Sequence, residues 1–138
     1  MSSSDSVTEI RDELARRVDA IESAYEFMLA YAAQGALSDT AVSSGAQLRD
    51  LLQRFDQSLD GLADVFRRLV AAQGLDAHTY EGFLEVLARD AASTAGALRM
   101  VRAQPGISSQ LIDNLNASIH VRALLTDVFL VDELLKAG

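Results

Sequence analysis

Apolar residues recur at steps of three and four along nearly the whole chain, and this spacing constrains the fold more than any other feature. The first run extends over seven turns and comprises Val7, Ile10, Leu14, Val18, Ile21, Tyr25, Met28 and Ala32. Such spacing places side chains on one face of an α-helix, whereas a half-buried strand requires alternation with a period of two. Because no strand-like alternation competes with it, we expect an all-α protein.

Helix-breaking residues divide this pattern into four segments of similar length. Pro105 is the single proline, and the eight glycines fall mostly between the periodic runs. Gly61 lies inside the second run, but the apolar stripe keeps its phase across it, so one continuous helix is expected there. The predicted helices cover about residues 6–34, 44–73, 77–103 and 108–137.

The start of three of these segments carries a capping pattern. Ser6 with Glu9, and Ser44 with Gln47, have the spacing of capping boxes. Ile107 and Ile112 fit the two positions of a hydrophobic staple around the start of the last segment. Four long helices with short second and third connections predict a single domain, an up-down-up-down four-helix bundle.

Composition excludes several classes of partner and site. The net charge is −8, from 20 acidic and 12 basic residues, and an acidic surface repels a phosphate backbone, so no nucleic-acid partner is expected. The absence of cysteine excludes disulfides and thiolate chemistry. The start of the chain is acidic without an apolar run, and no stretch approaches 18 uncharged apolar residues, so neither a secretory signal nor a membrane span is predicted. A cytoplasmic protein is expected.

Two of the predicted helices carry more apolar surface than one bundle core requires. In the first helix, Phe27 and Tyr31 lie roughly opposite the main stripe. In the last helix the apolar set shifts by well over 90° after His120, and Leu130 and Leu134 lie on yet another side. Either these faces pack against a second copy or another protein, or the last helix breaks near His120 or a long loop folds back over the surplus.

The sequence gives little support to catalytic or metal-binding chemistry. Helical bundles that hold two iron ions use Glu-x-x-His on two helices, and this motif is absent. A phosphoryl group on His120 would be repelled by aspartates expected on the same polar line, Asp113 and Asp127. The chain also lacks a G-x-S-x-G motif, a P-loop and a G-x-G-x-x-G motif. We therefore expect no enzyme, no metal and no cofactor.

The favoured prediction is a non-enzymatic interaction protein with an accessory, assembly-factor, chaperone or regulatory role. It would bind a protein partner or, as a homodimer, a second copy of itself through Phe27, Tyr31, Leu130 and Leu134. The alternative is a bundle that binds or senses a small apolar ligand in a pocket near Tyr25, Met28 and Tyr80.

Overall fold

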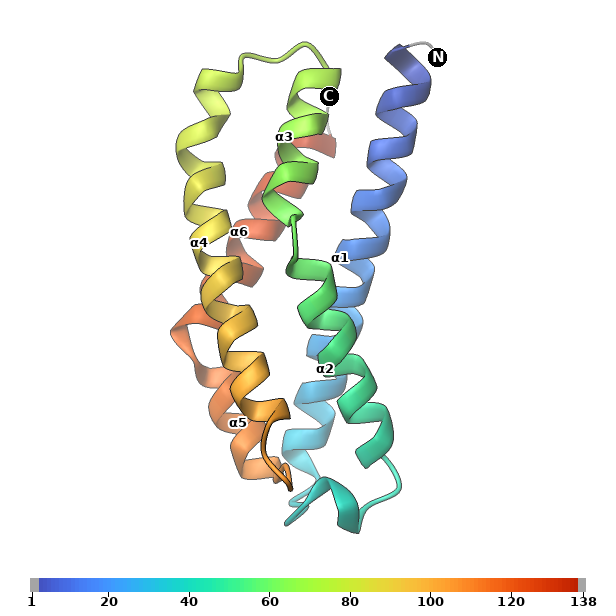
Figure 1. The fold of residues 1–138 in the computed structure, drawn as a ribbon, viewed down its shortest axis with the longest axis vertical. Helices are drawn as coiled ribbons and strands as arrows, with labels where there is room; N and C mark the ends of the chain where they lie inside the picture. Colours follow the sequence, from blue (N-terminus) through green and yellow to red (C-terminus); the bar gives the residue numbers. More distant parts are fainter. Residues whose placement is uncertain (1–2, 137–138) are drawn as a thin grey trace.

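Every regular element of the described residues is helical, so the all-α class is confirmed (Figure 1). The computed structural model describes residues 3–136, with side chains from residue 6. The elements, in chain order, are α1 (Ser3–Ala33), the short 3-10 helix η1 (Asp39–Ala41), α2 (Gly45–Leu59), α3 (Leu62–Ala72), α4 (Ala77–Arg102), α5 (Ser109–Ala117) and α6 (Ile119–Lys136). No helix within residues 3–136 combines the length and the apolar character needed to cross a bilayer.

The helices lie side by side along one long axis. α1 packs against α2, α3 and α5, and α4 packs against α2, α3 and α6. Figure 1 shows α3 continuing the direction of α2, and α6 continuing that of α5 from the lower end to the upper end. α4 runs the other way, so α4 and α6 are antiparallel neighbours.

The second predicted helix, residues 44–73, is interrupted at Asp60 and Gly61, so the expectation of one continuous helix through Gly61 is wrong. Gly61 adopts a left-handed conformation with φ of 72°, which an α-helix cannot contain. The interruption deprives carbonyl groups at the end of α2 of their helical partners. The Arg17 side chain of α1 donates to two of them, the carbonyl oxygens of Ser58, at 3.1 Å, and of Asp60.

The last predicted helix, residues 108–137, is also two helices, and the alternative of a break near His120 is confirmed. Ser118 has φ of −58° and ψ of 132°, outside the helical region. Its hydroxyl oxygen accepts from the His120 amide at 3.3 Å, and its carbonyl accepts from the Arg122 amide, so α6 starts afresh. The restart explains why the apolar pattern changes phase at this point.

The helix starts agree with the sequence signals only in part. α1 begins at Ser3, so Ser6 lies inside the helix and does not cap it. Ser44 precedes α2 as expected but makes no side-chain capping bond. At α5, Ser108 caps the helix with its hydroxyl, and the two staple residues Ile107 and Ile112 are both fully buried.

A buried ion pair, the Asp39–Arg49 clamp, joins four segments at the lower end of the molecule. The Arg49 Nε donates to Asp39 Oδ2 at 2.6 Å, and the amide of Ile107 donates to Asp39 Oδ1 at 2.7 Å. Arg49 also donates to the carbonyl oxygen of Arg102, the last residue of α4, at 3.0 Å, and to that of Gln104, just beyond the helix, at 2.9 Å. The hydrogen bond from Arg49, above all, holds the pKa of the Asp39 carboxyl below its ordinary value.

We expect Asp39→Asn to lower the free energy of unfolding at pH 7 by about 2 kcal/mol, because it removes the charge that Arg49 and the Ile107 amide bind. A lowered folded-state pKa stabilises the fold above the pH at which the unfolded carboxyl ionises, about 4, and this stabilisation disappears as the pH falls further. Urea unfolding at pH 7 and at pH 3 measures both effects. A variant as stable as the wild type at pH 7 would contradict the structural role of the clamp.

Gly45 provides a second test of the same region. A Cβ atom at Gly45 would lie 1.8 Å from the backbone oxygen of Asp39, whereas one at Gly82, in α4, would meet no atom within 4 Å. Gly45→Ala should therefore destabilise the fold by more than about 2 kcal/mol, and the matched control Gly82→Ala should stabilise it by about 0.5–1 kcal/mol through helix propensity. Thermal unfolding of the two variants measures both changes in stability. Equal changes in the two variants would be inconsistent with this packing at Gly45.

Candidate docking surface

Tyr31 is an internal residue, so the prediction that it forms part of an exposed interface is wrong. Its side chain is fully buried, and its hydroxyl donates to the carbonyl oxygen of Ile107 at 2.6 Å. The carbonyl oxygen of Tyr31 accepts from the Ser109 hydroxyl, also at 2.6 Å. Burial raises the pKa of the Tyr31 phenol above its ordinary value. The segment before α5 therefore covers the surface that the sequence pattern left open.

Phe27 lies on the same line of α1 and is half-buried against the core. Ala24, one turn before it, is completely buried. Both apolar faces of this half of α1 are covered, because the helix has neighbours on two sides. α2 and α3 lie on one side, and α5 lies on the other. Most of the additional apolar surface of α1 is thus buried within one chain. Phe27 is therefore not counted among the residues of an exposed docking surface.

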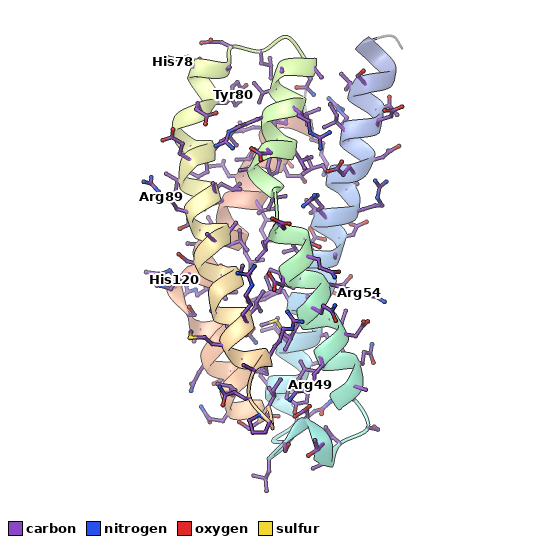
Figure 2. The ribbon with its side chains drawn as sticks, in the orientation of Figure 1. Arg49, Arg54, His78, Tyr80, Arg89 and His120 are labelled. Atoms are coloured by element: carbon purple, nitrogen blue, oxygen red, sulfur yellow. The ribbon has the colours of Figure 1, made fainter. Side chains whose placement is uncertain are left out.

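The three residues of the predicted ligand pocket do not meet. Tyr25 and Met28 lie in the last third of α1, which points to the lower end in Figure 1. Tyr80 lies near the start of α4 at the upper end, beside His78 (Figure 2). Met28 is fully buried, and Tyr25 and Tyr80 are half-buried against the core. They are separate core contacts rather than one cavity.

An open groove of about 310 Å³ lies instead at the interruption between α2 and α3. Its floor is formed by small residues of α4, among them Ala88, Ala92 and Ala95. Its rim carries charged residues that are already paired: Arg99 with Asp56, and Arg67 with Asp64. The small residues of α4 thus allow the interrupted pair of helices, α2 and α3, to pack close to α4.

Leu130 and Leu134 of α6 are exposed, at 48% and 56% of their surface. They lie one turn apart on the outer side of α6. Two contacts between α4 and α6 determine which residues of α4 lie at the level of Leu130 and Leu134. The Thr94 hydroxyl donates to the carbonyl oxygen of His120 at 3.1 Å, and the carboxyl of Asp90 interacts with that of Asp127.

This register brings apolar residues of α4 to the same level. Because the helices are antiparallel, one turn beyond the Asp90–Asp127 contact lie Val86 and Leu130, and two turns beyond it lie Phe83 and Leu134. Phe83 is 38% exposed and Val86 is half-buried. We call these four residues the outer seam. The sequence alone does not place Phe83 beside α6, since that requires the register between two helices distant in sequence.

Two exposed charges of α6 lie beside the outer seam, and neither has an ion-pair partner among the described residues. Arg122 and Glu133 are eleven residues apart, about three turns, and so lie near one line of the helix. Their opposite signs at the two ends of α6 give this face a polarity along the helix.

The titratable residues do not assemble into a metal centre anywhere in residues 6–136, where no three His, Asp or Glu side chains come together. His78 and His120 are exposed on α4 and α6 and lie far apart (Figure 2). The polar line expected around His120 is split by the break at Ser118, since Asp113 stays exposed while Asp127 is buried.

Comparisons of the chain with known protein families, with curated proteins and with solved structures find no match.

Proposed function

We propose that this protein is a non-enzymatic interaction module that docks through the outer seam. In architecture we regard it as an up-down-up-down four-helix bundle in which two of the four rods, α2 with α3 and α5 with α6, are interrupted. Two observations carry the proposal: Phe83, Leu130 and Leu134 are partly exposed, and the register of α4 on α6 brings them to neighbouring levels of two adjacent helices. Single exposed apolar residues are common, but a contiguous group is typical of an interaction site.

A second copy of the chain is the partner that we propose. In an antiparallel pairing of two α6 helices about a two-fold axis, Arg122 of one copy comes opposite Glu133 of the other, and the reverse pair forms by symmetry. Arg122 and Glu133 form no ion pair among the described residues, so pairing between copies breaks none of the ion pairs seen there. Leu130 lies between the two charges along α6, and Leu134 lies directly after Glu133, so both can add apolar contact to the pairing. Symmetry thus supplies both an apolar centre and complementary charges from one helix.

The alternative, a bundle that binds a small apolar ligand, has less support. Tyr25 and Met28 lie near the lower end of α1 and Tyr80 near the upper end of α4, and the groove beside α4 is open and rimmed by charged residues. Sites for apolar ligands are usually enclosed cavities lined mainly by apolar and aromatic side chains. Docking of a protein on the outer seam therefore accounts for more of the exposed apolar surface.

Leu130→Glu should abolish self-association and leave the helical content unchanged, because it places a charge in the proposed interface without disturbing the core. Leu29→Glu is a matched control, since Leu29 of α1 is 47% exposed and lies outside the outer seam. Small-angle scattering or sedimentation should give twice the mass of one chain for the wild type and the control, and the mass of one chain for Leu130→Glu. A wild type that stays monomeric at high concentration, or equal effects of both variants, would rule out this interface.

A charge exchange tests the orientation of the two copies. Arg122→Glu alone should weaken the dimer roughly tenfold, because it turns two attractive pairs into repulsive ones. The double variant Arg122→Glu with Glu133→Arg should restore the wild-type dissociation constant. Sedimentation equilibrium at low salt measures the three constants. Failure of the second exchange to restore affinity would refute the antiparallel arrangement, even if dimers form.

A further inference from the structure

Asp127 is a buried carboxyl group on the inner edge of the α4–α6 contact. It is 7% exposed, and its Oδ2 atom has no hydrogen-bond partner among the described residues. The polar side chain that interacts with it across the contact belongs to another acid, Asp90 of α4. An unpaired buried carboxylate is costly, and a second negative charge beside it adds to the cost. One of the two acids must therefore keep a proton for the contact to be favourable.

The surroundings of the pair offer no positive charge that would replace this proton. The cations of α3, Arg67 and Arg68, form ion pairs with Glu81 and Glu13. On α4, Arg89 is exposed, and the acid of α5, Asp113, is exposed as well. On α6 itself His120 and Arg122 are exposed, and Lys136 forms an ion pair with Asp132. Neither Asp90 nor Asp127 takes part in an ion pair within residues 6–136.

Burial, followed by the hydrogen bond and the charge of Asp90, raises the pKa of Asp127 to about 7. Asp127 thus changes its charge near neutral pH, where an ordinary aspartate is fully ionised.

The attachment of α6 makes it able to respond to this charge. It joins α5 through the extended Ser118 and does not continue its hydrogen-bond ladder. Its first turn is tied to α4 by the Thr94 hydroxyl, and its last turn is tied by the side chains of Arg11 and Gln73, which donate to the Leu135 carbonyl oxygen at 3.4 Å and 3.3 Å. The middle of the α4–α6 contact contains the acid pair.

We propose that Asp90 and Asp127 form a proton-dependent latch, in which a shared proton holds α6 against α4 and release of that proton to solvent loosens α6 about Ser118. The hydrogen bond between the two carboxyl groups exists only while one of them is protonated. Once both are ionised, the two charges repel across a contact from which water is largely excluded. The latch concerns a single chain and does not depend on the proposed dimer.

The sign of the pH effect follows from the raised pKa. Between the pH at which an unfolded aspartate ionises, about 4, and pH 7, the closed form keeps a proton that the open form has released. The stabilisation is complete below about pH 4 and is lost progressively as the pH rises to 7. With these two values, the opening equilibrium increases about tenfold between pH 6 and pH 8.

Introduced cysteines measure this opening, because the chain contains no cysteine of its own. Val128→Cys places a thiol on the fully buried face of α6, and Val18→Cys places a control thiol in the core face of α1. The rate of thiol labelling, divided by the rate for the same variant in denaturant, corrects for the thiolate fraction at each pH. We expect the corrected rate at Val128→Cys to rise about tenfold from pH 6 to pH 8, and the rate at Val18→Cys to change less than twofold.

Asp127→Asn removes the pH dependence if the latch exists. Its amide can donate to the Asp90 carboxylate at every pH, as the shared proton does, so the corrected rate at Val128→Cys should stay at the low value of pH 6. Asp90→Asn should act in the same way and serves as the second variant if Asp127→Asn does not fold.

Four results would overturn the proposal: no pH dependence at Val128→Cys, an equal rise at Val18→Cys, a rise that persists in both Asn variants, or protection of the Val128→Cys thiol, with both acids intact, by millimolar Mg²⁺ or Ca²⁺ at pH 8. The last result would assign the pair to a cation rather than a proton.

Discussion

The carboxylate of Asp39 determines how the lower end of this molecule is closed. It is buried between the Arg49 guanidinium and the Ile107 amide, and two charge-assisted hydrogen bonds offset the cost of removing it from water. The position of Ile107 in turn places a carbonyl oxygen over the hydroxyl of Tyr31. The second apolar face of α1 is thereby covered within the chain, so the exposed apolar surface is confined mainly to other helices.

The apolar period predicted the helical segments well, because each helix buries a stripe that its own sequence records. The predicted starts at residues 77 and 108 lie at or next to the observed starts of α4 and α5. The interruption at Gly61 was not predictable in the same way. The apolar stripe of the second predicted helix keeps its phase on both sides of Gly61. The carbonyl groups freed at the break are bound by Arg17, a residue more than forty positions away. At Ser118 the phase does change, so the sequence carried a visible sign of the break.

For the surface residues, the sequence identified Leu130 and Leu134 but misplaced Tyr31. A helical wheel counts apolar residues and does not report how many neighbours a helix has. α1 has neighbours on two sides and buries both faces, whereas no described helix covers Leu130 and Leu134 on the outer side of α6. The contribution of Phe83 and Val86 also required the register of α4 on α6. That register depends on contacts such as the Thr94–His120 hydrogen bond, which no local pattern encodes.

The α4–α6 contact has a polar part and an apolar part. Asp90 and Asp127 lie in its middle, and the outer seam begins one turn above them, with residues from both helices. A pair of apolar residues in place of the two acids would avoid the cost of burying carboxyl groups and would hold α6 at any pH. The acids instead make the position of α6 depend on a proton. Because the outer seam is continuous only while α6 lies against α4, the same proton would also govern the shape of the surface that we propose for docking.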